Sequence, residues 1–284
     1  MATYTAPLRD MRFVYRELFD GDGLATLPGY GDFTADVVDA VLEEAGKLAA
    51  EVLFPLNRSG DEEGCHFENG VVRTPKGFKE AYDKYVEGGW PALAVDPEHG
   101  GQGLPVVLNQ CLYEMLNSAN QAWAMYPGLS HGAYECLHAH GTDEQKATYL
   151  PKLTSGEWMG TMCLTESHCG TDLGLLRAKA EPQADGSYRI TGEKIFISAG
   201  DHEMAPNIVH LVLARLPDAP HGSKGISLFV VPKYLIGADG KPGARNAVWC
   251  TGLEHKMGIN GSATCQISLD GAVGTLVGEP NKGL

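Results

Sequence analysis

The stretch MCLTESHCGTD, from Met162 to Asp172, holds two cysteines, a histidine, two acids and several hydroxyls within eleven residues. Its hydroxyl side chains, Thr165, Ser167 and Thr171, can donate hydrogen bonds to a carbonyl or phosphate oxygen. Gly170 lets the backbone come close to a bulky ligand. Taken alone, the stretch is equally compatible with a ligand-binding loop and with a plain turn between a helix and a strand.

A catalytic cysteine nucleophile is one possibility that these residues suggest. In that case Cys163 or Cys169 would give its proton to His168. Adjacent side chains of an extended segment point to opposite faces, however, so a neighbouring pair does not readily share a proton. We therefore expect both thiols to have packing roles.

A zinc site is a second possibility, built from Cys136, His138 and His140. Side chains two positions apart on a helix do not face one another, and a fourth ligand is missing. Core or surface packing is the favoured role of these three residues. We predict no metal site in the chain.

Downstream of this stretch the sequence predicts a sheet. Beyond about Gly156 the pattern consists of short β-branched or alternating runs separated by turn dipeptides, of which Asp185-Gly186 is the strongest and Asp239-Gly240 the second. Strands spaced this closely, with no helices between them, favour an antiparallel sheet or barrel over a parallel βαβ array. The predicted strands span residues 187–191, 193–198, 208–215, 226–231 and 264–269.

Upstream of it the sequence predicts helices. Residues 32–56 place apolar side chains at spacings of three and four, with Pro55 near the end, which is typical of an amphipathic helix. HGGQGLP, residues 99–105, predicts a loop or tight turn, and Thr142 can cap the last helix. Weaker helical patterns span 75–87, 104–126, 132–140 and 143–153. The predicted fold is α+β, with a helical domain at 1–157 and a β domain at 158–284.

The charge and composition of the chain limit the kinds of partner that we expect it to bind. With 22 basic and 36 acidic side chains the net charge is −14, which repels the phosphate backbone that nucleic-acid binders neutralise. The N-terminus lacks the apolar core of a secretory signal, and no apolar run approaches the ~18 residues that span a bilayer. The seven cysteines are scattered without a CxxC pair, which is typical of reduced thiols. We expect a cytoplasmic protein that neither binds nucleic acid nor crosses a membrane.

The common nucleotide-binding motifs are absent from the sequence. There is no GxGxxG after a predicted strand and no GxxxxGK followed by Ser or Thr, so a dinucleotide would not be held in a Rossmann domain. The chain ends at GEPNKGL, directly after a strand and a turn. Because a helical domain followed by a sheet normally needs further chain to cover the second sheet face, we expect a fragment.

The opening stretch and a second motif together resemble a known family. GTMCLTESHCGTDLGLLRAKA at 160–180, followed by ITGEKIFISAG at 190–200, is similar to the flavin-binding signature of the acyl-CoA dehydrogenases. In that family a Thr-Glu-Pro-x-Ala-Gly-Ser-Asp segment precedes a Gly-x-Lys-x-Trp-Ile-Thr/Ser strand. HGGQGLP and GLEHKMGINGSATC match the flanks in order, so the resemblance covers nearly the whole chain. The N-terminal YTAPLRDMRFVYRELF resembles the branch that includes 3-methylmercaptopropionyl-CoA dehydrogenases and proteins thought to act on ordinary fatty acyl-CoA.

This resemblance implies a fold and a cofactor. The family has an N-terminal helical domain, a middle β domain and a C-terminal helical bundle, which this chain would lack, with FAD between the middle domain and the bundle. Thr165 would hydrogen-bond the polar edge of the flavin, Phe196 would stack beside the ring in place of a usual tryptophan, and Thr171 would also contact acyl-CoA. The FAD contacts implied by the motifs are Met162, Leu164, Thr165, Gly170, Thr171, Phe196, Ile197 and Ser198.

Three positions of the first motif depart from the family pattern. Ser167 replaces proline and Cys169 replaces alanine, which would loosen or enlarge the loop, whereas Thr171 keeps the hydroxyl of the usual serine. His168 falls at the variable position, outside the direct contacts of the ligand. We expect Cys169 to be a small buried apolar side chain.

The activity implied by the resemblance is α,β-desaturation of an acyl-CoA thioester. A carboxylate base removes the Cα proton, a hydride passes from Cβ to flavin N5, and the electrons leave to an electron-transfer flavoprotein. The counterpart of Glu166 is not the base. The base is a glutamate of the C-terminal bundle, so we expect it beyond Leu284, with no catalytic residue in this chain and no activity of this chain alone. A homodimer or homotetramer is usual in the family. The alternatives are an acyl-CoA oxidase and a non-catalytic acyl-CoA-binding module of the same fold.

Overall fold

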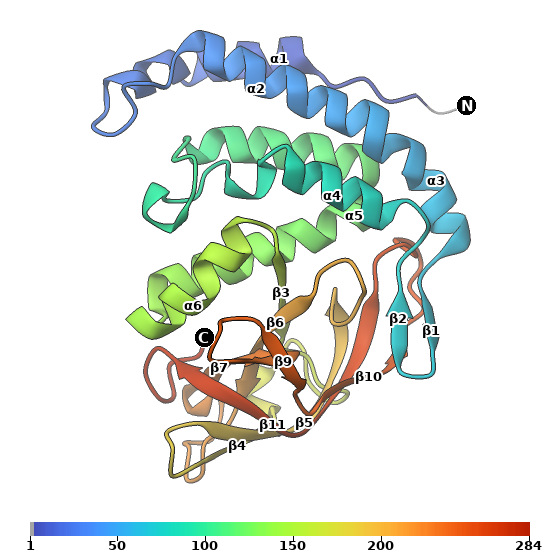
Figure 1. The fold of residues 1–284 in the computed structure, drawn as a ribbon, viewed down its shortest axis with the longest axis vertical. Helices are drawn as coiled ribbons and strands as arrows, with labels where there is room; N and C mark the ends of the chain where they lie inside the picture. Colours follow the sequence, from blue (N-terminus) through green and yellow to red (C-terminus); the bar gives the residue numbers. More distant parts are fainter. Residues whose placement is uncertain (1–2) are drawn as a thin grey trace.

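Helices come first along the chain and strands second, within the described residues 3–284 of a computed structural model (Figure 1). The helices are α1 (Leu8–Phe13), α2 (Ala35–Lys47), α3 (Phe54–Glu63), α4 (Phe78–Glu87), α5 (Val106–His140) and α6 (Asp143–Thr154). In Figure 1, α1 and α2 form the outer layer, α4 and α5 lie beneath them, and the strands gather on the far side of α5 and α6. No helix in this part of the chain has the length and apolarity to cross a bilayer. The α+β class is confirmed, while the domain boundary at 157/158 stays a prediction.

The helix predicted at 32–56 starts later and continues further. α2 begins at Ala35, and a π-helical turn, Leu48–Leu53, joins it to α3, which ends at Glu63. Pro55 lies in the first turn of α3, where a helix does not need the backbone N–H that proline lacks. The proline therefore begins a helix here and does not end one.

The helices predicted at 104–126 and 132–140 are one bent helix, α5. Asn120 interrupts the helical backbone with φ −158° and ψ 86°. Its Oδ1 accepts a hydrogen bond from Trp123 N at 3.1 Å, as an N-cap residue does, and its Nδ2 donates to Leu53 O at 3.2 Å. One buried side chain thus ends the first half of α5 and starts the second.

The remaining helix predictions are close to the structure. α4 begins slightly later than predicted. Thr142 caps α6 as expected: its Oγ1 accepts from Gln145 N at 3.2 Å, and Gln145 Oε1 accepts from Thr142 N at 3.0 Å. The glycine-rich segment 99–105 is a connection before α5, and two of its glycines adopt the left-handed backbone that glycine tolerates best.

The strands form one large sheet and two small hairpins. The large sheet has the order β3-β6-β7-β11-β5-β4, and β10 pairs with β11. Its members are β3 (Trp158–Cys163), β4 (Lys179–Pro182), β5 (Tyr188–Ser198), β6 (Asn207–Ala214), β7 (Ser227–Pro232), β10 (Val248–Leu253) and β11 (Thr264–Val277). The hairpins are β1 (His66–Glu68) with β2 (Val71–Arg73), and β8 (Tyr234–Ile236) with β9 (Pro242–Arg245).

Strand predictions succeed where turn residues mark both ends. β6 and β7 agree closely with the prediction, Asp185-Gly186 lies between β4 and β5, and Asp239-Gly240 lies between β8 and β9. The strands predicted at 187–191 and 193–198 are the single strand β5, and β11 extends past 269. β3, β4 and β10 of the large sheet and the four strands of the two hairpins were not predicted. β3 pairs in parallel with β6, so the sheet is mixed and not purely antiparallel.

The sheet does not close into the barrel that was predicted as an alternative. A single isolated bridge between Lys179 and Arg215 links the start of β4 to the end of β6. Across residues 3–284 no continuous ladder completes a ring, and β3 and β4 remain the end strands of the order. The β region is therefore an open mixed sheet.

Close backbone contact fixes β3 against the helices. A Cβ on Gly160 of β3 would lie 2.4 Å from the Ala133 Cβ of α5, so only glycine fits there. Gly160 N donates to Ser130 Oγ at 3.1 Å. On the neighbouring helix, Gln145 Nε2 donates to Leu276 O of β11 at 2.9 Å. The loop that follows β3 consequently starts from a firmly held position.

Candidate functional site

The loop after β3 is a tight turn and not an extended segment. Glu166 N donates to Cys169 O at 2.9 Å, and Cys169 N donates back to Glu166 O at 3.0 Å. The side chains of Glu166, His168 and Cys169 consequently place their polar atoms within 4.8 Å of one another. The expectation that neighbouring side chains diverge here was wrong because it assumed an extended backbone.

This proximity does not produce a cysteine nucleophile. His168 Nε2 lies 3.0 Å from Leu175 O, and a carbonyl only accepts, so Nε2 carries the proton and donates it. Cys169 is buried, and burial in β3 raises the pKa of the Cys163 thiol to about 12. Cys163 is therefore a protonated thiol at neutral pH and packs as an apolar side chain.

The cysteine and histidines near the end of α5 do not converge on a metal either. His138 stacks on Tyr134 with ring centroids 5.5 Å apart, and His99 meets His138 edge-on at 5.4 Å. Cys136 and His140 join no group of three ligand-type side chains within residues 3–284. The one such group in that range is the turn described above, and its carboxylate is already engaged.

A buried ion pair ties the turn to β5. Lys194 of β5 is fully buried, and its Nζ donates to Glu166 Oε1 at 2.9 Å and to Leu164 O at 3.0 Å. The Glu166 carboxylate also accepts from Arg177 N at 2.8 Å and from Ala178 N at 2.9 Å. One carboxylate therefore holds both ends of the loop. We call Glu166 and Lys194 the loop latch.

The Glu166 carboxyl of the loop latch is ionised at neutral pH, while burial lowers the pKa of Lys194 and the Glu166 carboxylate opposes that shift. Burial by itself would raise the pKa of Glu166, but the Lys194 ammonium and the backbone donors outweigh burial and lower that pKa below its ordinary value. Removal of one partner would leave an uncompensated charge in the interior, at a cost of about 3–5 kcal/mol. With donors on both oxygens, Glu166 is a structural anchor.

The end of β5 has a strained backbone. Phe196 and Ala199 have φ values of 57° and 54°, in the left-handed region that costs an L-residue roughly 1–2 kcal/mol. The Phe196 side chain is 46% exposed, and Lys256 Nζ lies 4.9 Å from the centroid of its ring. Strain of this kind persists only where the surrounding structure enforces it, and it concentrates at functional sites.

The loop and the end of β5 lie side by side. Ile195 N donates to Thr165 O at 2.9 Å, and the Thr161 hydroxyl donates to Ser198 O. Thr165 is half-buried at this junction. Gly170 is next to it, since a Cβ on Gly170 would lie 3.3 Å from Thr165 Cγ2. The structure thus brings together the two motifs that the sequence singled out.

The predicted flavin contacts fall into two groups, which we call the loop wall and the strand wall. Ile197 differs from the others because its side chain is buried in the core, which leaves only its main chain available to a ligand. The remaining side chains and Gly170 are half-buried or exposed. The loop wall is Met162, Leu164, Thr165, Gly170 and Thr171, and the strand wall is Phe196, Ile197 and Ser198.

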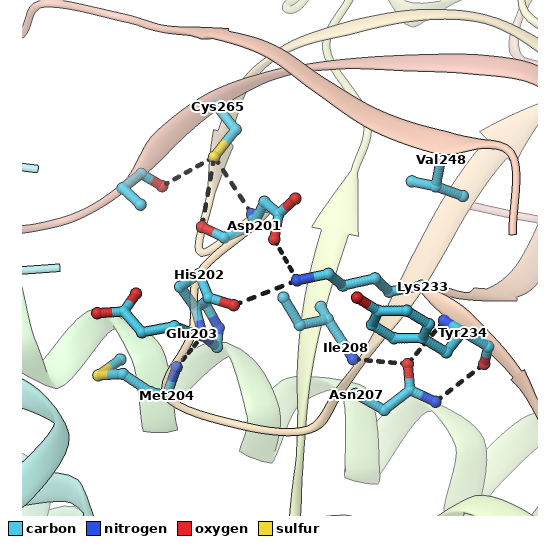
Figure 2. A network of polar contacts seen from close by, with 12 residues as sticks. Asp201, His202, Glu203, Met204, Asn207, Ile208, Lys233, Tyr234, Val248 and Cys265 are labelled. Atoms are coloured by element: carbon cyan, nitrogen blue, oxygen red, sulfur yellow. Dashed lines mark hydrogen bonds and ion pairs between the residues drawn. The ribbon is translucent and has the colours of Figure 1, made fainter. Parts of the chain in front are cut away.

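A second buried network, which the sequence did not reveal, begins at Asp201, three residues after the strand wall ends (Figure 2). Lys233 Nζ pairs with the Asp201 carboxylate and donates to His202 O at 3.2 Å. Arg245 Nη2 approaches the other Asp201 oxygen at 3.4 Å, and Asp201 N donates to Cys265 Sγ at 3.2 Å. We call Asp201 and Lys233 the strand latch. No local pattern marks them, because 32 residues separate the two.

Buried histidines adjoin the strand latch. Burial lowers the pKa of His202 to about 3, so its ring is neutral at ordinary pH. Its Nδ1 accepts from Met204 N at 3.2 Å, and its ring meets Tyr126 edge-on at 5.3 Å. Burial also lowers the pKa of His210, which contacts Gly200 O at 2.8 Å. Protonation of either ring is therefore unfavourable in the folded state.

A groove of about 650 Å³ opens beside the far end of the loop. Arg177 and Lys179 have exposed side chains on its lining, together with two carboxylates. Arg215 joins its two sides, donating from Nε to Leu176 O at 2.7 Å and from Nη2 to Gly174 O at 2.7 Å. The exposed cations make the groove a candidate place for an anionic group of a ligand.

Comparison with known proteins identifies the family of the chain. A model of the acyl-CoA dehydrogenase N-terminal domain matches residues 36–157, and a model of the acyl-CoA dehydrogenase middle domain matches residues 161–272. The chain belongs to the acyl-CoA dehydrogenase family. The resemblance inferred from the loop and strand motifs is confirmed.

Two relatives show how much of an acyl-CoA dehydrogenase the chain represents. A 3-methylmercaptopropionyl-CoA dehydrogenase of Ruegeria pomeroyi is 48% identical over 99% of this chain and 48% of its own length. A butyryl-CoA dehydrogenase of Syntrophomonas wolfei is 39% identical over 97% of this chain and 46% of its own length. The chain therefore spans about half the length of the curated relatives it matches.

Two solved structures share the fold. Caenorhabditis elegans ACDH-11 in complex with C11-CoA has a TM-score of 0.76 at 20% identity, with 99% of this chain and 48% of that chain covered. An acyl-CoA dehydrogenase of Bacillus anthracis complexed with FAD has a TM-score of 0.70 at 24% identity, with 88% and 38% covered. These similarities support the fold, and at such identities the fold alone.

Proposed function

We propose that this chain forms the FAD-facing half of an acyl-CoA dehydrogenase that desaturates an acyl thioester between Cα and Cβ. The observation that carries the proposal is the meeting of the two motifs, since Thr165 O accepts from Ile195 N beside the exposed and strained Phe196. A flavin ring has apolar faces and a polar edge. An aromatic ring next to a hydroxyl offers a matching partner to both.

In the proposed complex each wall has its own role. Thr165 would donate a hydrogen bond to the polar edge of the flavin, and Phe196 would lie beside the ring. Ile197 would contribute its main chain because its side chain is buried. Gly170 would leave room for the pyrophosphate, and the exposed Thr171 hydroxyl would reach the acyl-CoA. FAD, when bound, supplies the hydride acceptor.

The proton acceptor is expected outside these residues. Glu166 is engaged by Lys194 and by backbone donors, so it has no role in removing the Cα proton. We expect a glutamate beyond Leu284 to act as the base, as in the family fold. This chain alone should accordingly hold FAD weakly and show no dehydrogenase activity.

The proposed substrate is 3-methylmercaptopropionyl-CoA or a fatty acyl-CoA. The names of the relatives support this choice, and the exposed Arg177 and Lys179 of the groove suit the phosphates of CoA. We further propose a homodimer or homotetramer in the cytoplasm that passes electrons to an electron-transfer flavoprotein. The oligomeric state and the electron acceptor rest on the family resemblance, and the location rests on the sequence patterns described above.

An anaerobic titration of the full-length protein tests the proposed function. The protein should be purified with the visible absorption bands of bound flavin, and 3-methylmercaptopropionyl-CoA or butyryl-CoA should bleach those bands. Bound flavin that no acyl-CoA reduces would contradict the proposed reaction. A full-length protein without flavin would favour the non-catalytic acyl-CoA-binding module.

An acyl-CoA oxidase remains the nearest alternative within flavin chemistry. The two enzymes differ in how readily the reduced flavin meets oxygen. Admitting air after anaerobic reduction separates them: a dehydrogenase should reoxidise slowly until an electron-transfer flavoprotein is added, whereas an oxidase should reoxidise within the mixing time.

A further inference from the structure

The strand latch, whose contacts Figure 2 shows, holds the chain two residues after the strained Ala199 at the end of the strand wall. The backbone is left-handed at Phe196 and again at Ala199, and such strain persists only where the surrounding structure fixes the chain. On the far side the fixed points are Ala199 N, which donates to Ala263 O at 2.8 Å, and Asp201 N, which donates to Cys265 Sγ at 3.2 Å.

Lys233 holds this far side by two separate contacts. Its Nζ pairs with the Asp201 side chain and also donates to the main chain of His202 at 3.2 Å. The exposed fractions of the paired side chains are 11% for Lys233 and 7% for Asp201, so little water competes with the pair. Because Lys233 contacts both the Asp201 carboxylate and the His202 carbonyl, it fixes the direction in which the chain leaves the strand wall.

Lys233 is itself firmly anchored. It directly follows β7, and its backbone N donates to Ile208 O at 2.8 Å. Asn207 holds the next residue, because its Oδ1 accepts from Tyr234 N at 2.9 Å and its Nδ2 donates to Tyr234 O at 3.0 Å. Figure 2 shows these contacts on one side of the latch and Cys265 on the other. The ammonium group therefore projects from a rigid part of the sheet.

We infer that Lys233, through Asp201, is a positioning residue that keeps Phe196 and Ser198 in the geometry that binds the flavin. The inference rests on the proposed function and goes beyond it, because neither residue belongs to the two flavin motifs and neither touches the cofactor in the proposed complex. The strand latch sets the orientation of the strand wall, whereas the loop latch sets that of the loop wall.

The test compares single and double variants of the full-length protein. Lys233→Met leaves Asp201 with only the longer contact to Arg245, and Asp201→Asn leaves the Lys233 ammonium without its carboxylate, while the double variant removes both charges of the latch. Lys282→Met, which breaks the exposed pair with Glu279, is the matched control. Three quantities are measured: thermal stability, hydrogen exchange of amides 199–201 in FAD-free protein, and the FAD dissociation constant.

We expect each single variant to lower the melting temperature, to speed exchange of these amides at least tenfold and to raise the FAD dissociation constant at least tenfold. The double variant should recover much of the stability, yet exchange and FAD affinity should stay impaired, because nothing then holds the main chain of His202. The control should match the wild type in all three. If a single variant does not fold, the amide exchange and the FAD dissociation constant of the double variant test the inference.

Two results would overturn the inference. One is a dissociation constant within twofold of the wild type in the folded variants. The other is FAD affinity that recovers together with stability in the double variant, since a merely structural role predicts that recovery. A wild type that binds no flavin would instead defeat the proposed function, and the exchange data would still decide whether Lys233 fixes the strand wall.

Discussion

The loop wall and the strand wall of the proposed flavin site are held in different ways. The loop wall has unstrained turns and is held by Glu166 and Lys194, both of which belong to the two motifs. The strand wall is strained at Phe196 and at the adjoining Ala199, and it is held by Lys233, which belongs to neither motif. The loop wall is thus stabilised by residues of the motifs themselves, whereas the strand wall depends on a residue that is distant in the sequence.

Breaking the loop latch should have the largest effect on stability. Lys194→Met leaves the Glu166 carboxylate buried and unpaired, and we expect it to lower the free energy of unfolding by about 3–5 kcal/mol. Adding Glu166→Gln should restore part of that loss, because no charge then remains unpaired. Urea unfolding of this chain measures both effects. A matched Lys47→Met change at the exposed pair with Glu44 should leave stability unchanged, and a Lys194→Met variant as stable as that control would refute the latch.

Mild acid should distinguish the two walls. The pKa of His202 is lowered to about 3, so between pH 6.5 and 5.0 the unfolded state binds a proton that the folded state does not, and about 2 kcal/mol of stability is lost. Glu166, whose pKa is also lowered, contributes stability that is lost only below about pH 4.5. Of the two latches, acid in this window therefore affects only the surroundings of the strand latch.

Unfolding curves at several pH values check this point. His202→Asn keeps an acceptor for Met204 N but cannot titrate, so the variant should lose about 2 kcal/mol less than the wild type over the same interval. Other buried histidines, such as His210, retain their own share of the acid dependence. Equal slopes for variant and wild type would mean that His202 is not neutral in the folded state.

Relief of the backbone strain should have the smallest effect. Ala199→Gly removes the left-handed penalty of roughly 1–2 kcal/mol but adds disorder to the unfolded chain, so we expect a net gain of about 0.5–1 kcal/mol. Ala147→Gly on the exposed face of α6 should instead lose about 1 kcal/mol. Denaturant midpoints of both variants give the comparison, and a loss at Ala199 as large as that at Ala147 would show that no strain is present.

The features that could be predicted from the sequence are those that depend on local patterns of residues. The α+β class, the capping role of Thr142, the Asp185-Gly186 hairpin and the family resemblance all depend on residues close together in the chain. β3 was missed because nearly all of its side chains are buried, so the strand shows no alternation of apolar and polar residues. The gap predicted between 104–126 and 132–140 falls at Pro127, which lies inside α5, whereas the bend at Asn120 lies within the first predicted helix and had no signal of its own.

Parts of the site that depend on distant contacts could not be predicted. Thr165 and Phe196 were identified by motif. The hydrogen bond to Thr165 O and the left-handed backbone of Phe196, however, are visible only in the folded chain. The Asp201–Lys233 pair brings together residues from different segments, and a sequence without an alignment offers no signal for it. The turn at 166–169 also reversed the expected directions of neighbouring side chains.

The FAD dissociation constant of the full-length protein tests the central claim that the two walls form one flavin site. Thr165→Val removes the hydroxyl of the loop wall, and Phe196→Ala removes the ring of the strand wall. Each should raise the constant about tenfold, the loss of one hydrogen bond or one aromatic contact. Phe13→Ala, a similarly exposed ring on α1, should stay within twofold of the wild type. Wild-type affinity in both wall variants would contradict the account.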